Sequence, residues 1–339
     1  MKIRDDIKLY AKLATAQVGY VAGQVEVTSK CFQHCKYCRS WRDKDYAGKF
    51  TLQQMKFFVE ELLEFPAFEH LTLTGGDPQA WPYLTVFLEW WERSEAMDSI
   101  DLQVSTALAR DIDTPALWRR TIKDLRVSLD AFAPKTYTFV RGDHSNSPDS
   151  ILTRLKELNH PNLAIIITMY PSTIKQLFPL LCLIDTLYNK GLTIRKIMIM
   201  AGIGVVLDKE FWCEWDRIKE WAEFNMAVTT SFAESIPVVR SMCASPEVNH
   251  IRCWTSRLGF HIKPNGDVYS CCLIGGEAIK VQKEFCMGNI FEQDLADIYN
   301  SYTPTKYGMK HTCKEICQYK QLCINLAGEL AYQTRMAIP

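Results

Sequence analysis

The middle of the chain alternates between short apolar runs and longer segments with helical spacing. The expected strands, all between residues 23 and 226, are Gln24–Thr28, His70–Thr74, Asp101–Ser105, Leu125–Leu129, Leu163–Met169 and Lys196–Met200. Several are apolar throughout, such as Leu-Ala-Ile-Ile-Ile at 163–167. Continuous apolar runs are typical of parallel strands that are buried on both faces.

Segments with helical spacing follow these strands. Thr51 and Gln54 resemble a capping box at the start of the first segment, and Pro66 closes it. The other expected helices are Tyr83–Trp91, Pro115–Thr121, Asp149–Leu158, Ile174–Asn189 and Glu210–Phe224. Six strand–helix units in series predict an α/β fold, a partial (β/α)6 barrel with a parallel sheet. Ligands of such folds bind at the carboxyl ends of the strands.

The pattern changes after about residue 235. Residues 258–274 predict a hairpin around the turn sequence Pro-Asn-Gly-Asp at 264–267, and a short helix is expected near Gln293–Ser301. Many cysteines surround these elements. We therefore expect two domains, a partial barrel over 1–235 and a small cysteine-rich α+β domain over 236–339.

Composition narrows the functional classes. Lys plus Arg and Asp plus Glu both number 39, which gives no electrostatic reason to expect nucleic acid as a partner. Residues 1–10 hold two aspartates and no apolar signal region, and the longest apolar run, 197–207, is too short to span a bilayer. We expect a cytoplasmic protein without membrane contact. In a reducing compartment, thirteen cysteines favour metal binding or catalysis over disulfides.

The first cysteine group, Cys31, Cys35 and Cys38, has C-x3-C-x2-C spacing directly after the first expected strand. Three thiolates can ligate three irons of a [4Fe–4S] cluster and leave the fourth iron open to another ligand. A structural zinc site instead uses four protein ligands. Gly75-Gly76-Asp77-Pro78 ends the second strand, where glycines expose backbone carbonyls that can accept hydrogen bonds from an amine.

These two motifs, with Tyr37 before the last cysteine, resemble the radical S-adenosylmethionine (SAM) superfamily. The resemblance implies that SAM binds the open iron and is cleaved by one electron to methionine and a 5′-deoxyadenosyl radical, which abstracts hydrogen from a substrate. It implies an electron donor such as flavodoxin or ferredoxin. It also implies contacts with SAM from Tyr37, Gly75, Gly76, Asp77, Ser105, Thr106, Ser128, Asp130 and Arg141.

The later cysteines resemble the SPASM/Twitch extension of that superfamily, which carries auxiliary [4Fe–4S] clusters. No cysteine follows Cys323, where a full SPASM domain has more, so one auxiliary cluster fits best. The resemblance implies that its ligands are Cys253, Cys271 and two of Cys313, Cys317 and Cys323. Cys243 and Cys286 leave a second auxiliary cluster open, and a structural zinc site is the alternative.

Three further cysteines are considered singly. Cys272 follows an expected cluster ligand, at a position where some relatives have an acidic base, and is the candidate catalytic residue as a hydrogen-atom donor. The competing prediction, which we favour, is that the auxiliary cluster accepts an electron from the substrate. Cys182 and Cys213 lie in expected helices and are predicted to be buried and inert.

The sequence therefore predicts a radical SAM enzyme that acts on a small-molecule or nucleotide substrate, with an auxiliary cluster assisting oxidation or rearrangement. About thirty residues precede Cys31, so we expect no N-terminal peptide-recognition module. A peptide-modifying maturase or epimerase is the second prediction. The third is a non-enzymatic iron–sulfur electron carrier or a zinc-stabilised binding module. The amine-binding strand end at Gly75–Pro78 argues against this third class, because a carrier does not need it.

Overall fold

A computed structural model describes residues 22–38, 47–66, 68–143, 145–201, 209–233, 259–269 and 286–301, and the structural statements below concern these residues. The strands are β1 (Ala22–Thr28), β2 (His70–Gly75), β3 (Asp101–Thr106), β4 (Asp124–Ser128), β5 (Leu163–Met169), β6 (Lys196–Ala201), β7 (Thr230–Ala233), β8 (Gly259–Ile262), β9 (Asp267–Tyr269) and β10 (Cys286–Asn289). The helices are α2 (Leu52–Leu63), η1 (Pro78–Ala80), α3 (Leu84–Trp91), α4 (Ala96–Ser99), α5 (Pro115–Thr121), α6 (Pro134–Arg141), α7 (Pro148–Leu158), α8 (Ile174–Asn189), α9 (Lys209–Asn225) and α14 (Leu295–Ser301).

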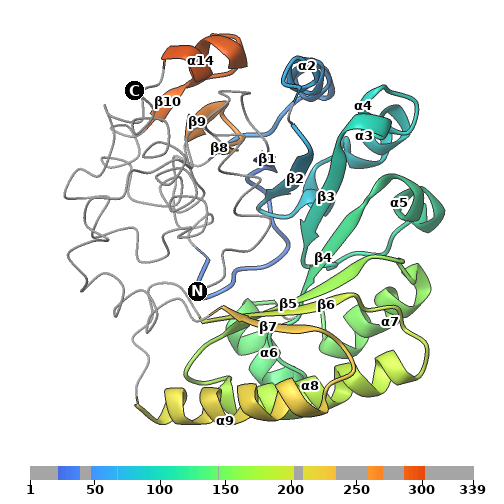
Figure 1. The fold of residues 1–339 in the computed structure, drawn as a ribbon, viewed down its shortest axis with the longest axis vertical. Coiled ribbons are helices and arrows are strands. Elements are labelled where there is room, and N and C mark those ends of the chain that lie inside the picture. Colours follow the sequence, from blue (N-terminus) through green and yellow to red (C-terminus); the bar gives the residue numbers. More distant parts are fainter. Residues whose placement is uncertain are drawn as a thin grey trace, which may run out of the picture.

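Strands β1 to β7 pair in chain order and run parallel. The sheet curves, and the helices between its strands lie along its convex outer side (Figure 1). This arrangement confirms the α/β class and the partial barrel, and β7 adds one parallel strand to the six expected. The carboxyl ends of these strands meet at one rim of the sheet, where the predicted site residues gather.

The C-terminal hairpin continues the barrel sheet. Strand β8 pairs in parallel with β1, from Ala22 opposite Gly259 to Val25 opposite Ile262. Strands β9 and β10 follow as antiparallel neighbours, so the described strands form one ten-stranded sheet. The expected hairpin and short helix are confirmed as β8–β9 and α14. The expected domain boundary at 235/236 lies outside the described residues and stays a prediction.

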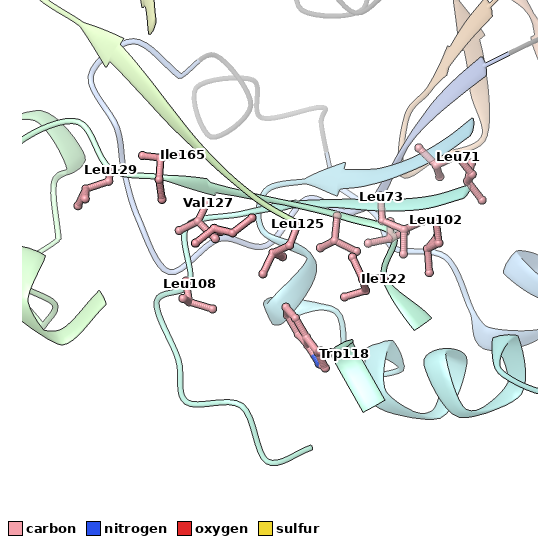
Figure 2. Close-up of a cluster of buried hydrophobic side chains, with 14 of the residues drawn as sticks. Leu71, Leu73, Leu102, Leu108, Trp118, Ile122, Leu125, Val127, Leu129 and Ile165 are labelled. Atoms are coloured by element: carbon pink, nitrogen blue, oxygen red, sulfur yellow. The ribbon is translucent and has the colours of Figure 1, made fainter. Parts of the chain in front are cut away.

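Alternating side chains determine how the sheet packs. On β2, β3 and β4, every second residue is buried in the layer between sheet and helices, as Leu71, Leu73, Leu102, Leu125 and Val127 show (Figure 2). The residues between them point to the opposite, concave side. Strand β5 is buried at nearly every position, as its apolar run predicts. The concave side of β1 to β4 is therefore polar and carries side chains that are not used in the core.

Local signals position the helices well. The Thr51 side chain accepts from the Gln54 backbone N–H, and the Gln54 side chain reaches back to the Thr51 N–H, which confirms the capping box before α2. The structure adds η1, α4 and α6, which the apolar periodicity does not predict. No helix in the described ranges is long and apolar enough to cross a membrane.

Candidate functional site

The loop with the three cysteines is attached to the C-terminal end of α6. The His34 N–H donates to the Arg141 carbonyl and the Lys36 N–H to the Val140 carbonyl, each at 2.9 Å. Helix α6 ends on Gly142 in the left-handed conformation, at φ 60°, where a Cβ would lie 2.6 Å from the His34 carbonyl oxygen. The backbone of the cysteine loop thus occupies space that only glycine leaves open.

Cys35 is buried, and Cys31 and Cys38 are half-buried. Burial raises the pKa of the Cys31 thiol to about 12, and the Asp77 carboxylate adds to the shift. Burial also raises the pKa of Cys35, against the opposing effect of the Arg141 guanidinium. These thiols stay protonated at neutral pH until a positively charged metal centre draws off the proton.

The three thiols of this loop are the predicted ligands of a [4Fe–4S] cluster, and single-ion sites are a separate question. Within the described ranges, no three His, Cys, Asp or Glu side chains approach closely enough to hold one metal ion. An iron–sulfur cluster needs one thiolate per iron, so its ligands stand further apart than four ligands around one zinc. In the predicted [4Fe–4S] cluster, each of the three thiols of this loop would ligate one iron.

Gly75 and Gly76 let the end of β2 lie against the start of the cysteine loop. Gly75 has φ +136°, and a Cβ on it would lie 2.4 Å from the Thr28 carbonyl oxygen. A Cβ on Gly76 would lie 2.1 Å from the Lys30 carbonyl oxygen. The Gly76 N–H donates to the Thr28 carbonyl at 2.7 Å. The two glycines are thus required by the backbone of this protein itself, in addition to any ligand.

Asp77 joins the ends of β2 and β3. It is buried, and its carboxylate accepts from the Thr106 hydroxyl at 2.7 Å, the Ala107 N–H at 3.1 Å and the Gln79 N–H at 3.0 Å. Burial raises its pKa, although these hydrogen bonds oppose the shift. Its oxygens therefore hold the rim together, and Thr106 directs its hydroxyl proton to Asp77.

Asp130, Tyr37 and Arg141 form a second buried group. Asp130 accepts from the Tyr37 hydroxyl at 2.5 Å and from the Thr168 N–H at 2.7 Å, and lies 2.8 Å from the Arg141 Nε. The side chains of Asp130 and Arg141 are 0% and 4% exposed. Burial raises the pKa of Tyr37 well above its usual range. Asp130 thus orients the tyrosine of the cysteine loop and the arginine of α6 at once.

The guanidinium of Arg141 has a hydrogen-bond donor that no described residue accepts. Its Nη1 reaches the Gln33 Oε1 at 3.2 Å and the Cys35 Sγ at 3.4 Å. Its Nη2 is buried and has no hydrogen-bond partner in the described part of the chain. A buried unpaired donor of a guanidinium is costly, so an anionic ligand group beside Cys35 would satisfy it.

Ser105 and Ser128 lie on the concave face of β3 and β4, beside core residues that point outward. The structure thus brings the predicted residues that follow four strands, β1 to β4, to one rim. Gln33, Tyr137 and Thr168 also belong to this site and were not predicted from the sequence. The Gln33 amide donates to the Tyr137 hydroxyl at 2.7 Å, and no local pattern indicates such a contact between a loop and a helix.

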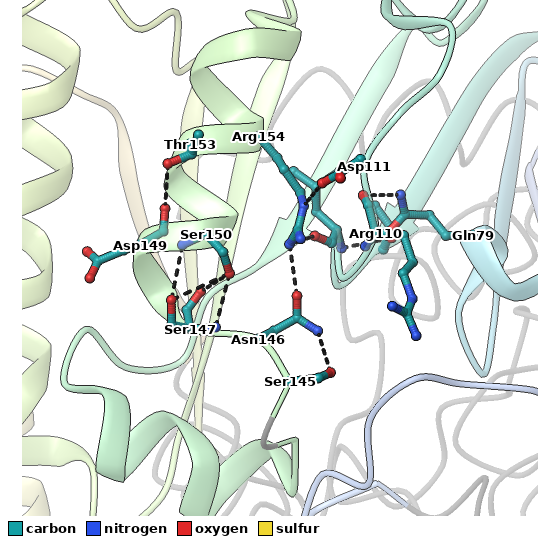
Figure 3. A network of polar contacts seen from close by, with 12 residues as sticks. Gln79, Arg110, Asp111, Ser145, Asn146, Ser147, Asp149, Ser150, Thr153 and Arg154 are labelled. Carbon is teal, nitrogen blue, oxygen red and sulfur yellow. Dashed lines mark hydrogen bonds and ion pairs between the residues drawn. The ribbon is translucent and has the colours of Figure 1, made fainter.

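A polar network fixes the neighbouring loop after β3 (Figure 3). Arg154 of α7 donates to the Leu108 carbonyl at 3.2 Å and the Asn146 side chain at 2.9 Å, and pairs with Asp111 at 2.6 Å. Gln79, next to the Asp77 turn, exchanges two hydrogen bonds with the Arg110 backbone. The loop after β3 is therefore fixed by Arg154 of α7 and by Gln79 beside the Asp77 turn.

The predicted auxiliary ligands Cys253, Cys271, Cys313, Cys317 and Cys323, the candidate Cys272, and Cys243 all lie outside the described residues. Cys286 is half-buried on β10. The prediction that Cys182 and Cys213 are buried is wrong: Cys182 is half-buried and Cys213 exposed. Helix α9 buries the stripe that begins at Phe211 and Trp215, and Cys213 lies off that stripe.

Family comparisons agree with this geometry. The model of the radical SAM superfamily matches residues 25–178, which begin in β1 and end within α8. The model of SPASM, an iron–sulfur cluster-binding domain, matches residues 253–323, a range bounded by two of the predicted ligands. No curated protein matches the chain in sequence.

Several solved structures share the fold. SuiB of Streptococcus suis bound to S-adenosylmethionine has a TM-score of 0.64 at 14% identity, over 85% of this chain and 68% of that chain. SuiB bound to its precursor peptide SuiA has a TM-score of 0.62 at 13% identity, over 87% and 68%. The protein anSMEcpe with bound AdoMet and Cp18Cys peptide has a TM-score of 0.60 at 12% identity, over 92% and 94%. At such identities the likeness shows the fold.

Proposed function

This chain is an enzyme of the radical SAM superfamily with a SPASM iron–sulfur domain, and we propose that it cleaves SAM reductively at Cys31, Cys35 and Cys38 to abstract hydrogen from a substrate. A reduced cluster at this loop supplies the electron that splits SAM into methionine and a 5′-deoxyadenosyl radical. The protein provides the cysteine ligands of the cluster, orients SAM and shapes the space around the substrate.

The observation that carries the proposal is the unpaired, buried Nη2 of Arg141, whose neighbouring Nη1 contacts the Cys35 thiol at 3.4 Å. Arg141 is charged, buried and held by Asp130, so it is pre-organised for a carboxylate such as that of SAM. Tyr37 and Asp130 act by orienting it. The end of β2 at Gly75 and Gly76 offers backbone carbonyls for the SAM ammonium group.

Ser105 and Ser128 complete the proposed SAM site with their hydroxyl groups from the concave face of β3 and β4. Thr106 and Asp77 contribute indirectly, because they bond to each other and fix the rim. Cys253, Cys271 and two of Cys313, Cys317 and Cys323 hold the auxiliary cluster in this proposal. That cluster accepts an electron from the substrate, which favours net oxidation. The competing role is hydrogen donation by Cys272 in a redox-neutral reaction.

The substrate class that we propose is a small polar molecule or a nucleotide. The polar concave face of β1 to β4, with side chains such as Glu26, Thr72 and Ser105 among its strands, supports a hydrogen-bonding ligand of limited size. A peptide is the second candidate, because SuiB and anSMEcpe share the fold and were solved with peptides bound. In either case the proposal includes an electron donor such as flavodoxin or ferredoxin.

The test is SAM cleavage by the anaerobic, reconstituted protein with dithionite. Wild type should release 5′-deoxyadenosine slowly even without substrate and contain about eight irons per chain. Replacing Cys31, Cys35 and Cys38 by alanine should abolish release and leave about four irons. The exposed Cys213→Ala variant is the matched control and should behave as wild type. Release of 5′-deoxyadenosine by the triple variant would disprove the assignment of this loop.

A further inference from the structure

A buried acid–imidazole pair lies on the concave face of the sheet. Glu26 of β1 and His261 of β8 approach to 3.0 Å between Oε1 and Nε2, with side chains 13% and 3% exposed. Their strand neighbours Val27, Phe260 and Ile262 are buried in the opposite, apolar layer. Alternation along the strands therefore directs both Glu26 and His261 to the concave side.

Several polar atoms of the Glu26–His261 pair lack hydrogen-bond partners among the described residues. Glu26 Oε2 and both ring nitrogens of His261 are buried without a hydrogen-bond partner in the described part of the chain. The Nε2–Oε1 contact has ion-pair distance but lacks the alignment of a hydrogen bond. Three unpaired polar atoms in one buried pair are costly for a native protein and point to a polar group that the pair is built to meet.

His160 provides the contrast within the same chain. It is 1% exposed, and both of its ring nitrogens are bonded: Nε2 to the Ile122 carbonyl at 3.0 Å, and Nδ1 by the Asn162 N–H at 3.1 Å. A buried histidine with a purely structural role is expected to have both ring nitrogens hydrogen-bonded, as His160 has. His261 is buried almost as deeply, yet it retains an open Nδ1.

The pair lies close to the proposed SAM site. Glu26 is the register partner of Thr74 on β2, one residue before the glycines at the rim. Gln24, two residues earlier on the same face, is the register partner of His261. A ligand that reaches from the rim into the concave side of the sheet meets Glu26 and His261 below the rim.

We propose that Glu26 and His261 form the acceptor for an O–H or N–H group of the substrate, carried by the carbon that loses its hydrogen atom. The inference rests on the proposed function and narrows its substrate class to alcohols or amines. His261 Nδ1 accepts the substrate hydrogen bond. Glu26 lies 3.0 Å from Nε2 and stabilises the cation that forms, as carboxylates do for basic histidines.

The step balances as a two-electron oxidation. The substrate carbon first loses a hydrogen atom to the SAM-derived radical, which leaves a carbon radical beside the O–H or N–H group. That radical passes one electron to an iron–sulfur acceptor and its O–H or N–H proton to His261 Nδ1. The carbon–oxygen or carbon–nitrogen single bond becomes a double bond. The imidazolium remains beside the Glu26 carboxylate, 3.0 Å away.

The first test measures protonation directly, without turnover. The oxidised holoprotein with 15N-labelled histidine is compared with the His261→Gln variant, which assigns the ring resonances. We expect Nδ1 of His261 to be unprotonated and Nε2 protonated near neutral pH, and Glu26→Gln to shift these resonances but not those of His160. A proton on Nδ1 at neutral pH would overturn the proposal, because that nitrogen could not accept.

The second test measures coupling to substrate. Extracts of small metabolites and of peptides are added separately to reduced, SAM-loaded wild type, His261→Gln and His160→Gln. We expect one extract to stimulate 5′-deoxyadenosine release by wild type and by His160→Gln. In His261→Gln, and in the isosteric Glu26→Gln, stimulation should fall on the order of 100-fold at unchanged iron content and unchanged substrate-free release.

The outcomes separate the two proposals. Full stimulation of His261→Gln would overturn the acceptor pair and leave the proposed function standing. If neither extract stimulates wild type, the proposed substrate classes fail, and the NMR measurement still decides the state of His261. Stimulation by the peptide extract alone would keep the acceptor pair and replace the small molecule by a peptide bearing an alcohol or amine.

Discussion

The Lys30 carbonyl oxygen occupies the place where a side chain on Gly76 would begin, 2.1 Å from the position of a Cβ. Gly76 is therefore required to let the loop that carries Cys31 pass over the end of β2. The sequence alone explains the glycine by the approach of SAM to the backbone. The structure adds that the cluster loop and the SAM-binding strand end share one close contact.

Replacing Gly76 by alanine should lower iron content and SAM affinity together, because the added carbon displaces the cysteine loop. The free energy of unfolding should fall by about 1–3 kcal/mol. Iron analysis and equilibrium dialysis with SAM measure the two losses. Gly191→Ala is the control, since Gly191 has φ +95° but no atom within 4 Å of a Cβ. Loss of SAM binding at full iron content would show that only the ligand requires the glycine.

Asp130→Asn should strongly destabilise the protein. The substitution keeps the shape of the side chain but leaves the buried Arg141 charge without its carboxylate, at a cost of about 3–5 kcal/mol. Denaturant unfolding measures the change. Glu92→Gln, in the exposed pair with Arg120, should leave the unfolding midpoint unchanged. A loss below about 1 kcal/mol for Asp130→Asn would mean that Arg141 finds another partner.

Arg141→Lys should weaken SAM binding by about 10- to 100-fold while a cluster still assembles. Lysine retains the charge but not the fork that reaches Asp130 and Gln33 while leaving Nη2 open. Titration of the reconstituted protein with SAM measures the affinity. Arg119→Lys is the control, since the Arg119 Nη1 donates to the Leu158 carbonyl on the helical side, and it should bind SAM as wild type does. Equal SAM affinity in the Arg141 variant would remove the proposed carboxylate contact.

His160 should contribute a stability that depends on pH. Burial lowers its pKa below the usual 6.5, so the folded protein favours the neutral form of the ring. This contribution is complete above pH 6.5 and is lost as the pH falls toward the folded pKa, because the unfolded chain takes up the proton first. Unfolding at about pH 8 and about pH 5.5 should show a smaller difference for His160→Gln than for wild type. Equal differences in both proteins would assign the pH dependence to other groups.

The sequence predicts the barrel elements well because their signals are local. Strand β5 and helix α8 follow directly from apolar runs and periodicity, and the capping box of α2 lies within four residues. Helix α6 (Pro134–Arg141) was not predicted because its buried face has no regular apolar spacing. The structure buries Tyr137, Val140 and the charged Arg141. The partner of this helix is the cysteine loop, and no local pattern records such a contact.

Site residues were easier to locate than to interpret. Motifs place Asp77 and Asp130 at strand ends, and both lie there. Their carboxylate oxygens, however, accept hydrogen bonds from the protein itself, including the Thr168 N–H and the Thr106 hydroxyl. Those donors come from neighbouring strands, so only the folded sheet reveals that these aspartates position other groups.

The parallel pairing of β1 with β8 has a consequence for biosynthesis. Residues 22–25 leave the ribosome early, but residues 259–262, which cover their open edge, are made only after the whole barrel segment. Closing so long a loop is entropically slow, and an unpaired strand edge is a site for aggregation. During translation, the edge of β1 that pairs with β8 therefore lacks this partner strand until residues 259–262 have been made. Slow synthesis or truncation before residue 259 should favour association through that edge over correct folding.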